Sequence, residues 1–283
     1  MTDSNTGITQ KEASELGIFV LPMPFMVEGE TFFEDISLTQ EEFFLKQENG
    51  LDIVTSQPSP ESVMTLWNEI LKEYDEIVHL PMSSALSGSC ETAMILAREE
   101  EYEGKVYIVD NKRISVLQTQ AIKDSLMYVK QGKSGQEVKD LLEADSLNYS
   151  VYIMVDTLYY LKKGGRITAT AAALGTLLKI KPILQIQGGK LDAFAKARTT
   201  NQGKTTMMNA IKNDIQTRFG GMVTPPNVTL HVAYTKDLDA AMKLKEELSE
   251  EFPGHIINIQ PLSLSIACHI GPGALAIAVT QNV

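Results

Sequence analysis

Cysteine and long hydrophobic runs are both scarce in this chain. Cys90 and Cys268 are the two cysteines among 283 residues, which excludes a framework of several disulfides and favours reduced thiols. No apolar run reaches the roughly 18 residues that a spanning helix needs. Residues 1–15 are too polar for a secretory signal peptide. We therefore expect a cytoplasmic protein with no stable membrane insertion.

Positive charge is also in short supply. The chain has 25 Lys and Arg residues against 36 Asp and Glu residues, so its net charge is −11 and its pI is ≈ 4.9. Nucleic acids and anionic membranes attract basic surfaces. The composition therefore argues against both as the main partner, and we expect no nucleic-acid partner.

The familiar sequence motifs of cofactor and metal sites are missing as well. There is no metal-ligand spacing of Cys and His, and no GxSxG nucleophile motif. Residues 198–206 end like a phosphate-binding loop, but Arg198 stands where that motif needs its first glycine. We expect neither a metal nor a cofactor, and the pattern favours a protein that binds an anion without catalytic machinery of its own.

What the first half does have is alternating strands and helices. Apolar runs at 77–80 and 105–110 are each followed by a helical pattern, over 90–104 and 115–132. Nearly all-apolar strands that alternate with helices favour a mostly parallel sheet with helices on both faces. The first half is therefore predicted to be an α/β domain.

The second half has a different order of elements. A strand over 150–157 leads into a helix that ends at Gly164–Gly165, a small-residue helix over 168–180 and a hairpin over 181–199. Residues 255–279 are expected to form two strands around a loop. We predict two domains, residues 1–150 and an α+β domain at 151–283, with the boundary near 148–153.

A cluster of hydroxyls separates a predicted strand from a predicted helix. Ser83, Ser84, Ser87 and Gly88 lie in this loop. Unpaired backbone N–H groups at a helix start attract anions, and hydroxyls add further donors. A simple N-cap needs one serine, so this many serines favour ligand contact.

Two further segments carry candidate ligand-binding side chains. Thr55 and Ser56 end another short strand, and ligands in open α/β sheets bind outside the carboxyl ends of the strands. Arg166 follows a glycine pair and is a multi-donor partner for a carboxylate, although a lone surface arginine is usually just solvated. His269 precedes a Gly-Pro-Gly turn. Cys268 is adjacent to it on an expected strand, where neighbouring side chains point to opposite faces, so a Cys-His dyad is not expected.

These motifs together resemble the DegV family. "TSQPSP", "SSALSGSCETA", "KKGGRI", "KPIL…GGKL…KART" and "HIGPGALAI" occur in that family's order, and the resemblance extends from Thr2 to the C-terminus. It implies two α/β domains with one long-chain fatty acid buried between them. It also implies a partner, a separate ATP-dependent fatty acid kinase that converts the bound carboxylate to acyl phosphate for phospholipid synthesis.

The resemblance also implies roles for single residues. The expected neighbours of the fatty acid carboxylate are Thr55, Ser56, Ser83, Ser84, Ser87, Gly88 and His269. Arg166 is expected at the mouth of the pocket near the head group, and Arg198 resembles the basic position tied to the kinase. A carboxylate in an apolar site needs several donors to stay ionised, which agrees with this set. The aliphatic residues of 168–184 suit a tunnel wall, and equally an ordinary core.

Two other functions remain open on the sequence alone. The first is a hydrolase or transferase that uses Ser87 or Cys90 as nucleophile, with His269 as the base. The second is a carrier of a small phosphorylated metabolite, which would need more positive charge than one or two arginines provide.

The beginning of the chain departs from the family pattern. Family members usually have an apolar strand before "TDS", whereas Met1 directly precedes Thr2 here. Either the start was assigned late or the strand is missing. In the second case the first sheet would lack a central strand, and we would expect lower stability.

Overall fold

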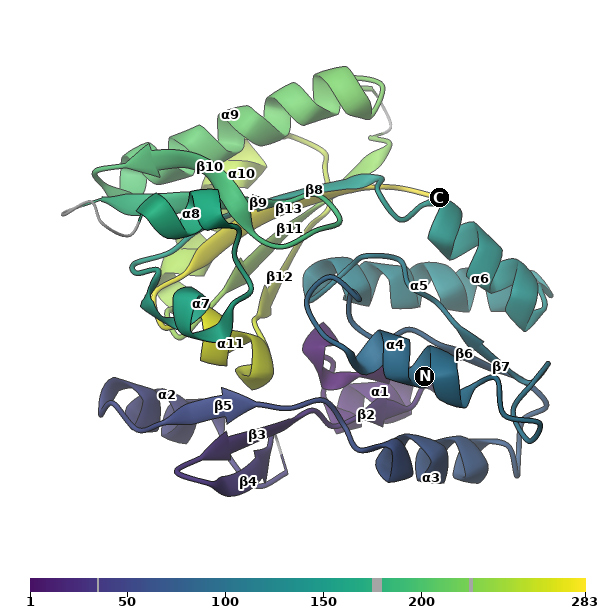
Figure 1. The fold of residues 1–283 in the computed structure, drawn as a ribbon. Helices are drawn as coiled ribbons and strands as arrows, with labels where there is room; N and C mark the ends of the chain where they lie inside the picture. Colours follow the sequence, from purple (N-terminus) through teal and green to yellow (C-terminus); the bar gives the residue numbers. More distant parts are fainter. Residues whose placement is uncertain (35, 175–179, 224–225) are drawn as a thin grey trace.

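Two bodies of secondary structure lie one above the other in the computed structural model, which describes residues 1–34, 36–174, 180–223 and 226–283 (Figure 1). The upper body is built on a six-stranded sheet with the strand order β10-β9-β8-β13-β11-β12. The strands are β8 (Tyr149–Met154), β9 (Lys181–Ile186), β10 (Asp192–Ala197), β11 (Val228–Tyr234), β12 (Ile257–Pro261) and β13 (Leu275–Gln281). Strands β11 and β12 are parallel, and the other neighbours are antiparallel.

Both faces of this sheet are buried. Along β8, Val151 and Ile153 face one core cluster, whereas Tyr152 and Met154 face another, as the two-residue period of a strand requires. Helices α9 (Thr200–Arg218) and α10 (Leu238–Glu251) cover the second face. The first face looks toward the lower body and packs against α7 (Tyr159–Gly164), α8 (Ala169–Leu174) and α11 (Leu264–Ile270).

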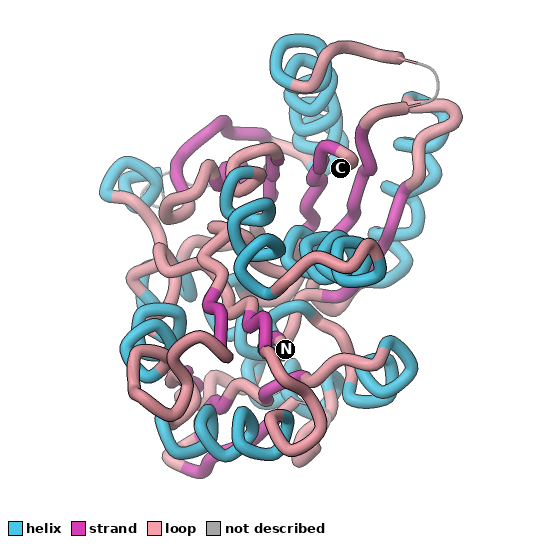
Figure 2. The backbone as a smooth tube through the Cα atoms, turned by 90° about the vertical axis from the view of Figure 1, so that its right-hand side faces the viewer, coloured by secondary structure: helices cyan, strands magenta, loops and turns pink. Residues whose placement is uncertain are grey.

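The lower body contains short parallel strands between helices, as Figure 2 shows from another side. The strands are β1 (Thr2–Asp3), β2 (Val20–Leu21), β6 (Ile77–His79) and β7 (Val106–Ile108). The helices are α1 (Gln10–Leu16), α3 (Pro60–Ile70), α4 (Ser89–Leu96), α5 (Val116–Lys130) and α6 (Gly135–Ala144), with a 3-10 turn at Ser4–Thr6. The expected α/β class, with a parallel N-terminal sheet flanked by helices, is confirmed.

A small lobe extends from the lower body beneath α11. It consists of β3 (Pro24–Val27), β4 (Glu30–Phe33), β5 (Ile53–Thr55) and α2 (Gln40–Glu48). The turn between β3 and β4 uses Glu28 and Gly29, both at positive φ, which is the backbone twist that a two-residue hairpin favours.

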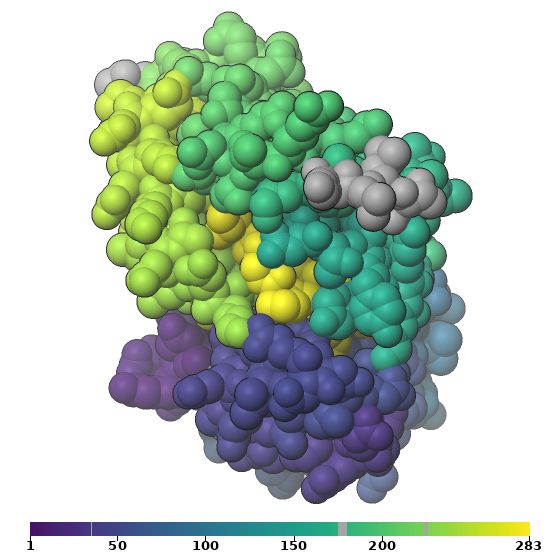
Figure 3. Space-filling view, turned by 90° about the vertical axis from the view of Figure 1, so that its left-hand side faces the viewer, coloured from purple at the N-terminus to yellow at the C-terminus, as the bar shows by residue number. Residues whose placement is uncertain are grey.

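Helix α11 joins the lobe to the upper body. Its Leu264 and Ala267 pack with lobe residues such as Phe25 and Phe43. Gln47 Nε2 donates to Ala267 O at 3.1 Å, and Leu264 N donates to Glu34 Oε2 at 2.8 Å. Figure 3 shows the C-terminal segment, in yellow, seated between the purple lobe and the teal segment above it.

Several sequence expectations need correction. Residues 255–279 are not two strands around a loop, because α11 lies between β12 and β13. The helix expected over 90–104 ends at Leu96. The polar N-terminal segment contains the unexpected helix α1, which starts with a capping box of Thr9 and Glu12.

The central position of the first sheet is occupied. Strand β1 pairs with β2, and Thr2 bridges to Leu80, while Leu80 N donates to Met1 O at 2.9 Å. Strand β1 thus provides a central strand between β2 and Leu80. The expected helix over 168–180 is present as α8 up to Leu174, and residues 175–179 lie outside the described part of the chain. The division at residue 150 stays a prediction, and β8 lies across it.

Two buried histidines make the stability of the fold depend on pH. His79 and His231 are each 2% exposed, and within the described residues neither ring nitrogen of His79 has a hydrogen-bond partner. Burial, with a smaller effect of the N-terminal charge, lowers the pKa of His79 to about 3. Burial, with smaller effects of Lys123 and Arg113, lowers that of His231 to about 3.

We expect the free energy of unfolding to fall as the pH drops from about 6.5 toward 3. Both imidazoles are neutral in the folded state but take up protons near pH 6.5 when unfolded, so acid favours the unfolded state by about 1 kcal/mol per pH unit for each histidine. His79→Leu removes the contribution of His79 to this pH dependence. Urea unfolding at pH 6 and pH 5 should show a slope about 1 kcal/mol per pH unit smaller than in the wild type, and equal slopes would contradict the assignment.

Candidate functional site

The loops that follow β5 and β6 face α7 and α11 across the gap between the two bodies. A cavity of about 200 Å³ lies at this junction. Its polar lining residues are Asn5, Thr55, Ser56, Gln57, Ser87, Gly88, Arg166, Ser265 and His269. Its apolar lining residues are Met23, Met82, Leu86, Ile114, Leu161, Leu191, Ile266 and Ile270. The apolar set belongs to, or packs against, the core cluster between the two bodies.

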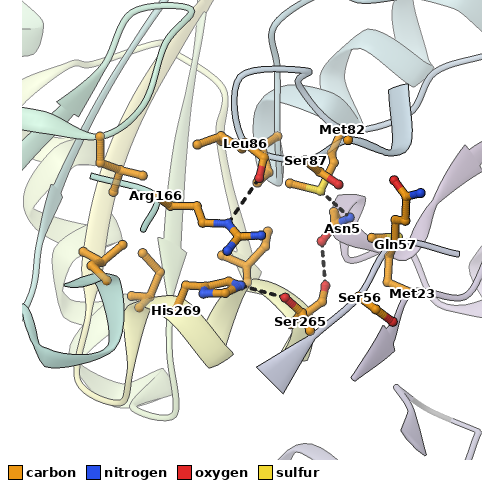
Figure 4. A pocket seen from close by; sticks show the side chains of 17 residues that line it. Asn5, Met23, Ser56, Gln57, Met82, Leu86, Ser87, Arg166, Ser265 and His269 are labelled. Atoms are coloured by element: carbon orange, nitrogen blue, oxygen red, sulfur yellow. Dashed lines mark hydrogen bonds between the residues drawn. The ribbon is translucent and has the colours of Figure 1, made fainter. Parts of the chain in front are cut away.

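His269 and Thr55 join the C-terminal helix to the lobe inside this cavity. His269 Nε2 and Thr55 Oγ1 share a hydrogen bond of 2.8 Å (Figure 4). Burial lowers the pKa of His269 to about 4, and the charges of Arg166 and Lys163 add to this effect. The imidazole is therefore neutral at neutral pH, where it acts as a hydrogen-bonding group and not as a cation.

The glycine pair after α7 explains how His269 is held. A Cβ atom at Gly164 would lie 2.1 Å from His269 Nδ1, so the ring packs directly on the backbone there. Gly165 ends α7 in the left-handed conformation with φ 69°, which glycine adopts without strain. The chain then turns toward Arg166.

Arg166 brings positive charge to the cavity. Its Nε donates to Leu86 O at 3.3 Å, and its NH1 donates to Gly164 O, so the guanidinium reaches from the upper body to the loop after β6 (Figure 4). No acidic side chain occurs among the described lining residues. An anion in the cavity would therefore meet a cation and no opposing carboxylate.

The start of α4 supplies further donors. Gly88 is its N-cap and contributes no side-chain cap. The N–H of Ser89 is already engaged by Ser87, which leaves the N–H groups that follow it in the first turn to an anion. Ser87 lies beside Gly88 in the lining, and its Oγ accepts a hydrogen bond from Ser89 N at 3.2 Å. Of the predicted serine cluster, Ser87 and Gly88 line the cavity, and their role in anion binding stays a prediction.

Two of the expected carboxylate neighbours lie outside the cavity lining, as does Arg198, which was expected at a contact with the kinase. Ser83 is buried, and its Oγ accepts from Ala85 N within the turn. Ser84 Oγ donates to Asp110 Oδ2 at 2.6 Å and accepts from Lys112. Neither serine lines the cavity, because each hydroxyl is engaged outside it. Arg198 is exposed between β10 and α9, also outside the lining.

The geometry gives little support to a nucleophile. Cys90 is fully buried in the α3–α4 core, and burial raises the pKa of its thiol to about 12. Cys268 packs with the lobe, and burial raises its pKa to about 12 as well. Ser87 lines the same cavity as His269, but the described residues show no hydrogen bond between them. A hydrolase needs that contact to activate the serine.

Sequence reasoning missed several lining residues. Ser265 and His269 are four residues apart on α11, a spacing that makes them neighbours on one face of a helix, whereas on a strand the same spacing would leave them about 13 Å apart. Asn5 lies in the polar N-terminal segment, where no motif distinguishes it from its polar neighbours. Recognising α11 as a helix would have identified Ser265.

Two larger hollows are less suited to an anion. One of about 470 Å³ between α1, α5 and β12 includes Glu12 and Glu15. The other, of about 590 Å³, is lined by Glu48, Asp156, Asp237 and Asp239 among others. Each hollow also contains one lysine, Lys123 or Lys236, but the carboxylates outnumber it and would repel a negative ligand.

Comparison with known proteins identifies the family. The family model described as "Uncharacterised protein, DegV family" matches residues 1–282. The chain belongs to the DegV family. Among DegV relatives, a DegV domain-containing protein of Clostridium perfringens is 31% identical, covering 98% of this chain and 94% of that protein. One of Staphylococcus aureus (strain N315) is 29% identical, covering 100% and 98%.

Solved DegV structures have the same fold. "Fatty Acid Binding of a DegV family Protein from Thermus thermophilus" superposes with a TM-score of 0.88 at 29% identity, covering 99% of this chain and 98% of that one. "Crystal Structure of DegV, a fatty acid binding protein from Bacillus subtilis" gives 0.86 at 26% identity, with coverage of 99% and 98%. Across the described ranges of the DegV chain, no helix combines the length and apolar character needed to cross a membrane.

Replacing Gly164 with alanine should displace the His269 ring. The new methyl would overlap Nδ1, so the ring must move and its hydrogen bond to Thr55 is lost; we expect a destabilisation of about 1–3 kcal/mol. Thermal denaturation and the imidazole NMR signals report the two effects. Gly189→Ala is the matched control, because a Cβ there meets nothing within 4 Å. A Gly164→Ala protein with unchanged stability and unchanged imidazole signals would contradict this packing.

Proposed function

We propose that this chain binds one long-chain fatty acid in the cavity between its two bodies and is not itself an enzyme. It presents the carboxylate to a separate ATP-dependent fatty acid kinase, which forms acyl phosphate for phospholipid synthesis. One observation carries the proposal. The cavity joins hydrogen-bond donors and a cation, with no acid among its described lining residues, to a wall of aliphatic side chains.

The donor end suits a carboxylate. Its residues are Thr55, Ser56, Ser87, Gly88, Arg166 and His269. A buried carboxylate stays ionised only when several donors solvate it, and hydrogen bonds to a charged group are about twice as strong as neutral ones. The N–H groups at the start of α4 add a favourable helix dipole.

The apolar end suits the beginning of an acyl chain. Each buried methylene contributes about 0.8 kcal/mol, so fifteen give on the order of 12 kcal/mol before association costs. The cavity of about 200 Å³ is smaller than the roughly 300–1,000 Å³ of ordinary ligand pockets. A full chain therefore needs side chains to move, and the flexible Met23 and Met82 in the wall are suited to that.

The relatives support the same ligand. The structures from Thermus thermophilus and Bacillus subtilis are named for fatty acid binding, at 29% and 26% identity over almost the whole chain. The alternative of a hydrolase has weaker support, because Cys90 lies outside the cavity and both cysteine thiols have raised pKa values.

The kinase would dock where Arg198 is exposed. This residue ends the β9–β10 hairpin segment and lies away from the cavity lining. A surface arginine is a strong partner for carboxylates or phosphates on another protein. We therefore assign Arg198 to partner contact and not to fatty acid binding.

Native mass spectrometry of the purified protein should reveal a co-purified long-chain acid, and delipidated protein should take up palmitate. Thr55→Ala and Ser87→Ala each remove a donor, so each should weaken retention about ten- to a hundredfold. Ser249→Ala, which removes a hydroxyl on α10, is the matched control. A protein that is free of lipid and takes up neither palmitate nor oleate would overturn the proposal.

Arg198→Ala should leave palmitate affinity unchanged and impair phosphorylation of the bound acid by the kinase. The reason is that the side chain is exposed and lies outside the cavity. Arg98→Ala, at another exposed arginine, is the control. Loss of palmitate binding in Arg198→Ala would show that the division of roles is wrong.

A further inference from the structure

Two polar side chains in the cavity wall have no part in the proposed carboxylate site. Asn5 is 1% exposed and Ser265 is 6% exposed, yet both line the cavity beside the apolar Met23, Met82 and Ile266. Ser265 Oγ donates to Asn5 Oδ1 at 2.6 Å. A buried polar pair is costly unless its hydrogen-bonding capacity is used.

Asp3 fixes the orientation of the Asn5 amide. Its Oδ1 accepts from both Asn5 N and Asn5 Nδ2 at 3.0 Å, and its Oδ2 accepts from Met82 N at 2.7 Å. Reversing the amide would place Asn5 Oδ1 against the Asp3 oxygen. The nitrogen therefore stays on the Asp3 side, and the oxygen stays on Ser265.

The second N–H of Asn5 has a poor partner. Its acceptor is the Met82 sulfur at 3.0 Å, and a thioether is a weak acceptor. Figure 4 shows Asn5 between Met82 and Ser265, with its amide in the cavity wall. Since methionine is flexible, a ligand oxygen can displace the sulfur and form a stronger bond.

Ser265 offers the complementary group. Its proton goes to Asn5, and of the two lone pairs on its oxygen, Ser263 Oγ can use one at 3.2 Å. The pair thus presents one donor and one acceptor side by side. A hydroxyl both donates and accepts, whereas an ionised carboxylate only accepts, so the pair matches an alcohol.

The position of the pair locates that alcohol on the ligand. Ser265 is four residues before His269 on α11, so their Cβ atoms lie about 5–6 Å apart on one helix face. His269 belongs to the proposed carboxylate site. A hydroxyl that reaches Ser265 therefore belongs to one of the first few carbons of the acid.

We propose that Asn5 and Ser265 form a specificity site for long-chain acids that carry a hydroxyl close to the carboxylate. This inference rests on the proposed fatty acid binding and names the class of acid that the cavity prefers. When such an acid binds, its hydroxyl takes the place of the Met82 sulfur as acceptor for the Asn5 N–H. Because both residues lie on one wall, the site distinguishes the two enantiomers of such an acid.

Calorimetric titration of the delipidated protein tests the proposal. The probes are palmitic acid, the two enantiomers of β-hydroxypalmitic acid and ω-hydroxypalmitic acid. One β-hydroxy enantiomer should bind about five- to tenfold more tightly than palmitic acid, the gain of one net hydrogen bond. The ω-hydroxy acid should show no gain, because its hydroxyl lies at the far end of the chain.

Two variants and a control assign the effect to the pair. Ser265→Ala removes the acceptor and Asn5→Leu removes the donor. In each variant the preferred β-hydroxypalmitic acid enantiomer should bind no more tightly than palmitic acid, so the ratio of these two affinities should fall to about one. Ser249→Ala on α10 should keep the wild-type ratio. If Asn5→Leu does not fold, Ser265→Ala and the wild-type comparison still decide.

The outcomes separate this inference from the proposed function. If palmitic acid binds but neither β-hydroxy enantiomer binds more tightly, the pair holds a water molecule and the specificity site is refuted. If the preference persists unchanged in Ser265→Ala, the hydroxyl is recognised elsewhere and the assignment is also refuted. If none of the acids binds, the proposed function itself has failed.

Discussion

The docking of α11 against the N-terminal lobe is the constraint on which the site depends. One side of this seven-residue helix packs with the lobe through Leu264, Ala267 and Cys268. The other side brings Ser265 and His269 to the cavity. The bond from Leu264 N to Glu34 Oε2 holds the start of the helix, the Gln47 bond to Ala267 O holds its middle, and the bond between Thr55 and His269 holds its end. Without this docking the two bodies would share no enclosed space.

The large sheet makes such a junction necessary. Every residue of β8 is buried, so both faces of the sheet need a cover. Helices α9 and α10 cover one face. The other face is covered partly by the short helices α7, α8 and α11 and partly by the N-terminal body. Short helices leave gaps that long ones would fill, and the cavity occupies one of these gaps.

Much of this arrangement was accessible from the sequence. The hairpin over 181–199 and the short helix that ends at Gly164–Gly165 both follow from turn residues and periodicity. The positions of Thr55, Ser87, Gly88, Arg166 and His269 in one cavity follow from the resemblance together with the chemistry of their loops. Local signals of this kind are strong because they depend on neighbours in the chain.

The remaining features depend on contacts between distant residues. Residues 264–270 are apolar enough for a strand, but they form a helix that packs Leu264, Ala267 and Cys268 against the lobe. The sequence predicts Ser84 as a ligand-binding hydroxyl, but in the fold this hydroxyl is bonded to Asp110 and Lys112. Asn5 and Ser265 are 260 positions apart and meet only in the folded chain. No periodicity or turn signal carries such information.

This separation along the chain has a consequence for biosynthesis. Asn5 and His269 both line the cavity, so the chain must emerge from the ribosome as far as His269 before the enclosure exists. The N-terminal body can collapse earlier, as domains do during translation, but its lobe then exposes Phe25 and Phe43 until α11 arrives to cover them. The lobe is therefore most exposed to misassembly before α11 has been synthesised.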